Sequence, residues 1–192
     1  MANKVQYGLK NVNYAVVTET TSGGVTTSSY GTPKPIKGAV TLSLSPSGDA
    51  SQFRADDSNY FTYGANSGYE GSYECAGFPS DFYEDVWGAQ RDDDDVLTEY
   101  TNDQTKYVAL LFEIDGDVKA TRYCFYKCFF KKPSIEAETT SEDGNEPKTV
   151  SSDITVSPRP DDGLVKSWAD DATDSTAYSG WYSSVFVPTF TP

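Results

Sequence analysis

Hydrophobic and polar residues alternate with a period of two along much of this chain, which is the pattern of half-buried β-strands. Residues 12–18, 36–44, 69–77, 133–139 and 149–157 all show it. Tyr, Thr, Ser and Gly are abundant, and this composition favours strands and turns over helices. We therefore predict a mainly β fold of two packed antiparallel sheets, arranged as a β-sandwich or a barrel-like pair.

The stretch 107–130 contains the longest alternation and predicts a β-hairpin, whose register follows from the faces that its side chains must share. A two-residue turn would pair Phe112 with Lys119, which is a poor match. A three-residue connection over residues 115–117 pairs Phe112 with Ala120 instead, and we predict that register.

In this register one face of the hairpin gathers apolar side chains that water would not tolerate as a single patch. The residues that we predict to form this candidate self-assembly surface are Tyr107, Leu111, Tyr123 and Phe125. Either a short helix or a neighbouring subunit can cover the patch, and the sequence alone does not divide the patch between them.

A single short helix is predicted at residues 81–88, flanking the sheets. Asp81 can cap its start and Gly88 can end it in a left-handed conformation. Phe82 and Val86 are spaced to face the same side, so packing on the sheet is expected to hold this short helix.

The chain length favours one domain, which we place at residues 1–168, followed by a C-terminal extension or arm at 169–192. Residues 19–35 have the composition of a long loop or a flexible hairpin tip, and 140–147 that of a projecting loop. Residues 91–104 read as an exposed acidic loop. The candidate assembly residues in these loops and in the arm are Asp92, Asp93, Asp94, Asp95, Glu142, Asp143, Trp181 and Tyr182.

The net charge is −14, from 29 acidic and 15 basic residues, and it opposes tight binding to nucleic acid or to anionic membranes. No apolar run approaches the length of a membrane span, and no secretory signal pattern appears. We therefore expect a protein that is made and kept in the cytosol.

Catalytic chemistry is not expected, because the chain has no histidine and its carboxylate pairs arise by chance among so many acids. No metal site and no cofactor motif is expected either. Cys75, Cys124 and Cys128 are predicted to be reduced and packed. On one strand, Cys124 and Cys128 would share a face and lie roughly 13 Å apart, beyond disulfide reach.

Several stretches, in this order, resemble the major tail protein family of long-tailed phages that infect Gram-positive bacteria. They are YGLKNVNYAVVTE, YGTPKPIKGAVTLSLSPSGD, FRADDSNYFTYGANSGYEGSYECAGFPSDFYEDVWG and RYCFYKCFFKKPSIEAETTSEDGNEPKTVSSDITVSPRP. The resemblance runs from about residue 7 to residue 168, and the succession of blocks carries it, most of all at residues 55–88.

This resemblance implies a tail-tube fold, hexameric rings that stack into a hollow tube, and a place in the virion after assembly in the host cytoplasm. It implies tape measure, tail terminator and baseplate or initiator proteins as partners, and transient passage of DNA. An acidic lumen would repel phosphates and let DNA slide. The acids that would line the lumen are not assigned by the sequence.

The sequence is also compatible with two other functions. A β-sandwich carbohydrate-binding module would use exposed aromatic rings as platforms for sugars, with Trp168 or Trp181 as candidates. A receptor-binding or decoration protein of a virion would share this composition and differ in copy number.

Overall fold

The computed structural model describes residues 3–48, 50–55, 57–64, 67–139 and 148–190. Strands make up 47% of the chain and helices 7%, which confirms the mainly β prediction. The strands are β1 (Gln6–Ser22), β2 (Val25–Tyr30), β3 (Lys34–Pro35), β4 (Ala39–Ser47), β5 (Ala50–Ala55), β6 (Ser58–Gly64), β7 (Gly68–Cys75), β8 (Gln90–Arg91), β9 (Leu97–Thr98), β10 (Val108–Gly116), β11 (Thr121–Phe130), β12 (Val150–Val156) and β13 (Lys166–Ala169). The helices are α1 (Ser80–Asp85) and α2 (Ser175–Ser179).

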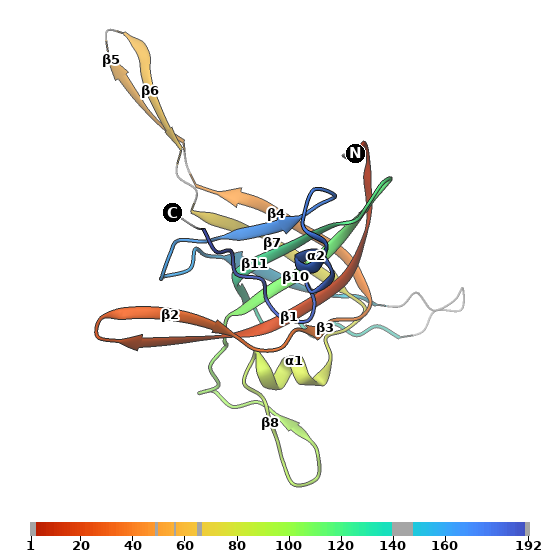
Figure 1. The fold of residues 1–192 in the computed structure, drawn as a ribbon. Coiled ribbons are helices and arrows are strands. Elements are labelled where there is room, and N and C mark those ends of the chain that lie inside the picture. Colours follow the sequence, from red (N-terminus) through yellow and green to blue (C-terminus); the bar gives the residue numbers. More distant parts are fainter. Residues whose placement is uncertain (1–2, 49, 56, 65–66, 140–147, 191–192) are drawn as a thin grey trace.

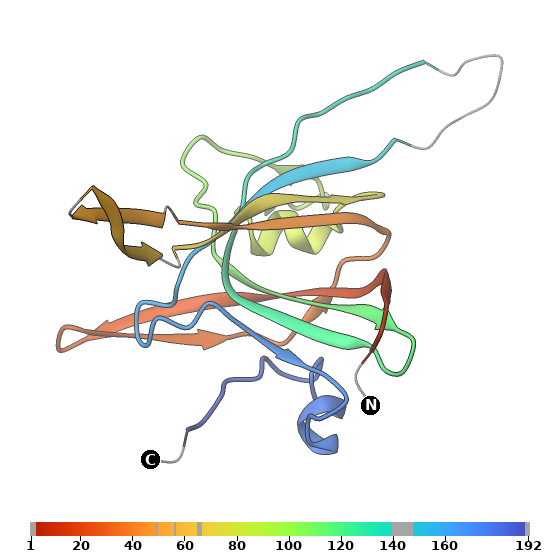
Figure 2. The same cartoon turned by 90° about the horizontal axis from the view of Figure 1, so that it is seen from above.

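One large antiparallel sheet forms the body, in the order β2-β1-β10-β11-β12-β7-β4, with β13 paired to β11 and β3 to β1. The sheet bends at β11, so that β4, β7 and β12 lie over β1 and β10 (Figures 1 and 2). The two predicted layers are therefore the two halves of one continuous sheet. Most of the hydrophobic core lies between them.

Helix α1 closes one end of this core. Phe82 and Val86 are fully buried, and the indole Nε1 of Trp87 donates to the carbonyl of Phe130 at 2.9 Å. Gly88 adopts φ +80°, as expected of the residue that ends the helix. Asp81 does not cap the helix, contrary to the prediction, because the N-cap position belongs to Pro79 and makes no side-chain bond.

The predicted register of the β10–β11 hairpin is wrong by three residues. Phe112 faces Tyr123, and Glu113 faces Arg122, with the Arg122 Nε and Glu113 Oε2 atoms 3.0 Å apart. This pairing removes Arg122 from beside Leu110, where the predicted register had placed it. An ion pair therefore replaces a charge lying against an aliphatic side chain.

The observed register requires a longer turn than the predicted one. Asn3, which lies outside the hairpin, holds this turn in place. The side chain of Asn3 donates from Nδ2 to the carbonyl of Lys119 at 2.6 Å. Its Oδ1 accepts from the backbone N–H groups of Val118 and Lys119, each at 3.0 Å. Contacts this distant in sequence are absent from any local turn pattern.

A register shift further along β11 reverses which side chains face the core. Val108 pairs with Cys128 but Leu110 pairs with Phe125, so β11 carries one extra residue between these pairs. Cys124 and Cys128 therefore lie in two different clusters, on opposite faces, and not on one face as predicted. Both thiols are buried and free, and burial raises their pKa.

Three other segments differ from the expected pattern. Residues 133–139, whose alternation predicted a strand, form no strand in the structure, and Ile135 is 99% exposed. Residues 19–35, expected as a long loop or a hairpin tip, hold the outer part of β1 and all of β2 in a regular hairpin. Val40, expected to be buried with Leu42, is 53% exposed because the β4–β7 ladder shifts register between Ala39 and Thr41.

The C-terminal segment, predicted as an arm, lies against the β10–β11 hairpin. It covers the face that carries Ala109, Leu111 and Cys124, called the second face below, which points away from the main core. Trp181 is 2% exposed and stacks on Phe186 with 5.4 Å between ring centroids. The hydroxyl of Tyr178 donates to the carbonyl of Ala120, and that of Tyr126 to the carbonyl of Phe186, both at 2.7 Å. The segment includes α2, a helix that the sequence pattern did not indicate.

Replacing the buried indole tests this cover. We expect Trp181→Ala to lower the free energy of unfolding by about 3–5 kcal/mol, the usual cost of deleting a buried aromatic side chain. Trp168→Ala is the matched control: because Trp168 is 57% exposed, its loss should cost less than about 1 kcal/mol. Urea unfolding followed by circular dichroism measures both, and equal losses would contradict the assignment.

Candidate functional site

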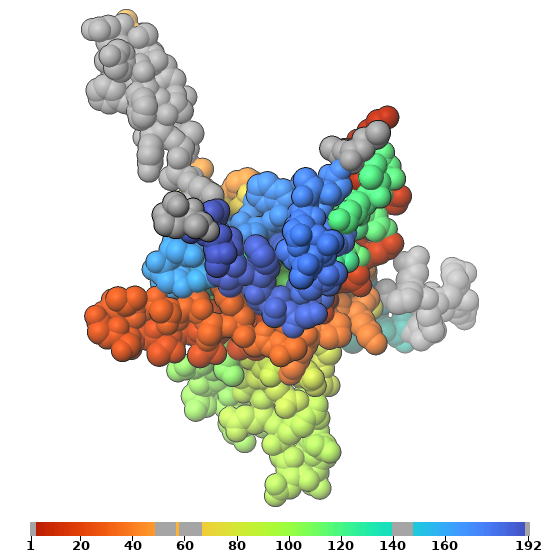
Figure 3. Space-filling view, viewed as in Figure 1, coloured from red at the N-terminus to blue at the C-terminus, as the bar shows by residue number. Residues whose placement is uncertain are grey.

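Extensions of the sheet and of its loops project beyond the core. The β1–β2 hairpin and the β8–β9 loop stand out from the body in the ribbon and in the space-filling view, and the β5–β6 hairpin does so in the ribbon (Figures 1 and 3). The β1–β2 hairpin has side chains described along its whole length and belongs to the main sheet. It is therefore the candidate site whose geometry is most fully defined.

The β1–β2 hairpin is a regular two-stranded ribbon that ends in a tight glycine turn. Ser22 faces Val25 across the turn, and Gly23 and Gly24 adopt φ +59° and +83°. Two successive residues with positive φ suit the two-residue turns whose twist matches that of a hairpin. Glycine is therefore required here, and the turn fixes the register of the ribbon.

The outer part of the ribbon is mostly exposed: the β1 residues 18–22 are all exposed, and the residues of β2 alternate between exposed and partly buried. Its side chains are almost all threonine and serine, and Val25 at the tip is 63% exposed. Strand β2 is also the free edge of the large sheet. Toward the tip of that edge, beyond Ser28, backbone N–H and C=O groups that point away from β1 are available to pair with a strand from another chain.

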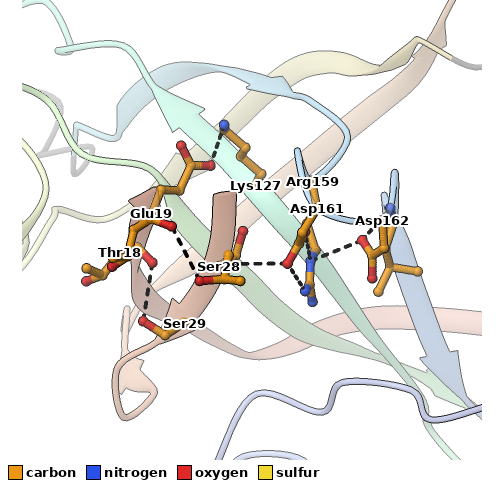
Figure 4. Close-up of polar contacts among 11 residues, drawn as sticks. Thr18, Glu19, Ser28, Ser29, Lys127, Arg159, Asp161 and Asp162 are labelled. Carbon is orange, nitrogen blue, oxygen red and sulfur yellow. Dashed lines mark hydrogen bonds and ion pairs between the residues drawn. The ribbon is translucent and has the colours of Figure 1, made fainter. Parts of the chain in front are cut away.

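The base of this hairpin is fixed by ion pairs to the body (Figure 4). Asp161 accepts from the Nε of Arg159 at 2.9 Å and from the backbone N–H of Ser28 at 3.2 Å. Lys127 of β11 pairs with Glu19 of β1 at 2.5 Å. The hairpin is thus held to the turn 158–164 and to β11 by charged groups.

Arg159 is the centre of this base and is almost fully desolvated. Its residue exposure is 7%, and its guanidinium lies 5.7 Å from the ring of Tyr30 and 5.8 Å from that of Tyr126. The hydrogen bonds from Arg159 lower the pKa of Asp161, and burial raises the pKa of Tyr30. A charge buried this deeply depends strongly on its carboxylate partner.

Three buried polar atoms at this base have no hydrogen-bond partner within the described part of the protein. They are the Nη1 of Arg159, the hydroxyl of Tyr30 and the hydroxyl of Ser28. Such atoms are normally satisfied by ordered water when the site is polar. We interpret the cluster as a structural anchor, because nothing in it supplies a nucleophile with a base.

The four residues predicted to form a self-assembly surface do not form one, and the prediction is wrong. Leu111 is fully buried beneath the C-terminal segment, on the second face of the hairpin. Phe125 is 4% exposed and Tyr123 is half-buried, both on the opposite, core face. Tyr107 is 37% exposed at the strand end. The register error explains this outcome, since a three-residue shift exchanges the faces.

The predicted assembly loop and arm are separated in the structure. The acidic residues 92–95 are exposed between β8 and β9. Trp181 is buried, and the hydroxyl of Tyr182 donates to the Oε2 of Glu113 at 3.4 Å, so both belong to the cover of the sheet. Glu142 and Asp143 lie outside the described residues.

Sequence reasoning missed Arg159 and Asp161 as the anchor of the hairpin. The sequence feature that could have indicated them is the run of proline, aspartate and glycine at 158–163. Such a run indicates a tight turn where charged groups can meet. Its partner, Ser28, is 133 residues away in sequence from Asp161, so no local pattern could join them.

Within the described ranges, no cluster of three or more His, Cys, Asp or Glu side chains is placed to hold a metal ion. In the same residues no helix has the length and apolarity needed to cross a membrane. Comparison with models of known protein families finds none that matches the chain, and comparison with curated proteins finds no match either.

Removing the acidic partner of Arg159 tests the anchor. We expect Asp161→Ala to lower the free energy of unfolding by about 2–4 kcal/mol, because the buried guanidinium then keeps, among the described residues, an ion pair with Asp162 alone. The control is Asp153→Ala, which breaks an ion pair with Lys131 whose side chains are about 70% exposed, and should cost less than about 1 kcal/mol. Urea unfolding measures both changes in the free energy of unfolding. Indistinguishable changes in the two variants would contradict the role of Asp161 as an anchor.

Proposed function

We propose that this chain is a structural subunit that assembles with copies of itself, and that it serves as the major tail tube subunit of a long-tailed phage. The observation that carries the proposal is the β1–β2 hairpin, a projecting and mostly exposed ribbon that is held at its base by buried charges. The resemblance of residues 7–168 to phage major tail proteins supplies the particular assembly: hexameric rings that stack into a hollow tube.

An isolated two-stranded ribbon is only marginally stable in water, so a projecting one needs a reason to persist. Exposed edge strands are normally protected by charged residues, proline or bulges. Strand β2 has the sequence VTTSSY and contains none of these protections. The outer part of this edge is therefore unprotected, while its base is anchored by Asp161, and such a ribbon is suited to pair with another chain.

The two free edges of the main sheet, β2 and β4, offer a way to close a ring. If β2 of one copy pairs with β4 of the next, the contact is head-to-tail, and such contacts generate rings when the rotation closes. Backbone pairing supplies the affinity in this mode of recognition, and side chains supply the specificity.

The charge of −14 supports the proposal because a negatively charged bore repels DNA phosphates and favours sliding. The tape measure, tail terminator and baseplate or initiator proteins are proposed partners, and the virion is the proposed location. Because the C-terminal segment covers one face of the β10–β11 hairpin, we propose that the assembly contacts lie in the projecting elements.

Electron microscopy of the purified protein tests the proposal. We expect negatively stained particles to show hexameric rings or tubes. Thr26→Pro should abolish them: counting from the two-residue turn, the backbone N–H of Thr26 points away from β1, and proline removes that donor.

Thr26→Ala is the matched control, because it removes the same hydroxyl contact with Thr21 and keeps the backbone N–H. Rings from the alanine variant, and none from a folded proline variant, are the expected pair of results. Wild-type protein that stays monomeric at high concentration would contradict the proposed function.

Carbohydrate binding remains a second candidate because of one exposed indole. Trp168 is 57% exposed, and an exposed indole ring can serve as a platform for a sugar ring. Trp181, the other candidate platform, is buried and unsuited to this role. Glycan binding by a monomer, lost in Trp168→Ala, would favour this function.

A further inference from the structure

The core is open at the end opposite α1, where it forms an apolar pocket of about 240 Å³. Side chains from both halves of the sheet line it: Leu9, Leu42, Leu44, Tyr69, Ile114 and Tyr123. These six side chains are only partly buried, and the buried rings of Phe112 and Phe125 form the floor. An apolar hollow of this kind is unusual on a surface as polar as this one.

Lys166 lies at this pocket and has no acidic partner among the residues that the structure describes. Its Nζ is 4.7 Å from the centroid of the Tyr69 ring and 5.8 Å from those of Phe125 and Trp168. Among the described residues, no carboxylate pairs with it. In a chain of net charge −14, an ammonium group held over aromatic rings without a carboxylate is available to an external anion.

The size of the pocket indicates what can enter it. Sites for drug-sized molecules usually span about 300–1,000 Å³. A hollow of about 240 Å³ falls below that range and better suits one or two aliphatic side chains of another polypeptide. The occupant should therefore combine an exposed aliphatic residue with neighbouring carboxylates.

The loop between β8 and β9 has this combination. Val96 is 56% exposed, and Asp93, Asp94 and Asp95 precede it, all exposed. Across the residues that the structure describes, no cation pairs with the side chains of Asp94 and Asp95. The loop thus presents an apolar side chain beside unneutralised carboxylates.

The backbone of this loop is already ordered. The Oδ1 of Asp92 accepts from the backbone N–H groups of Asp94 and Val96 at 2.9 and 2.8 Å. Arg91 donates to the carbonyl of Asp95 at 3.0 Å and to the Oε1 of Glu84 in α1 at 2.7 Å. A loop ordered before binding loses less conformational entropy when it docks.

The loop and the pocket lie at opposite ends of the molecule, so one copy cannot join them. Tyr123 and Phe125, near the start of β11, line the pocket, whereas Phe130 at its end packs on Phe82 of α1. Five or more residues of strand separate these points, which corresponds to roughly 20 Å. The β8–β9 loop projects further away, beyond α1 (Figures 1 and 3).

We propose that the β8–β9 loop of one copy docks into the apolar pocket of the next, with Val96 among the leucines and Asp94 or Asp95 against Lys166. This inference rests on the proposed function and assigns to this pair of surfaces the contact between stacked rings. The contact is heterologous, and its two surfaces face opposite ends, so it repeats along an axis without closing. Apolar burial supplies affinity, and the ion pair selects the orientation.

A charge exchange tests the contact in the full chain. We expect Lys166→Glu to leave rings intact and to shorten tubes about tenfold, because like charges then face each other across the contact. The double variant Asp94→Lys and Asp95→Lys should do the same. Combining all three substitutions should restore tube length. Negative-stain microscopy measures tube length, and urea unfolding confirms that each variant is folded.

Lys37→Glu is the control, since it makes the same charge change at an exposed position that does not line the pocket, and its tubes should keep their length. Long tubes from Lys166→Glu, or a triple variant that stays short, would overturn the inference and leave the proposed function standing. The inference would also be overturned if native mass spectrometry of wild-type tubes found a small apolar molecule bound stoichiometrically. Absence of rings and tubes in the wild type would overturn both.

Discussion

The burial of Trp181 against the second face of the β10–β11 hairpin is the contact on which the rest of the structure depends. That face carries Ala109, Leu111 and Cys124, all fully buried beneath the C-terminal segment. Without this cover, apolar strand surface at the centre of the sheet would meet water. With it, the chain buries this face itself, and the surfaces that the proposed assembly uses are the edge strands β2 and β4, the acidic loop and the open pocket.

Under the proposed function, this arrangement separates folding from assembly. The core and its C-terminal cover are apolar and aromatic, whereas the projecting hairpin is polar and fixed by Arg159 and Asp161 at its base. Polar extensions with few buried contacts cost little to expose while the subunit is free. The proposed pairing between chains would then proceed through backbone groups and through Lys166, without any rearrangement of the core.

The sequence predicted the elements better than their pairing. Alternation located most of the strands, and the spacing of Phe82 and Val86 located α1, because these signals are local. The β10–β11 register was mispredicted because it is set by Asn3, more than a hundred residues away, and by the Glu113–Arg122 ion pair. That error transferred the candidate surface to the wrong face. The anchor at Arg159 and the pocket beside Lys166 form only when distant strands meet, so local patterns did not indicate them.

Hydrogen–deuterium exchange, compared between the free subunit and its assembled form, tests the central claim most directly. The account predicts that assembly newly protects backbone amides in β2 and in the β8–β9 loop, and that amides of β10 and β11 are equally protected in both states. A large gain of protection in β10 and β11 on assembly, together with exposure of the C-terminal segment, would contradict it. That result would mean that the central sheet face is sealed by a neighbouring subunit and not by the chain itself.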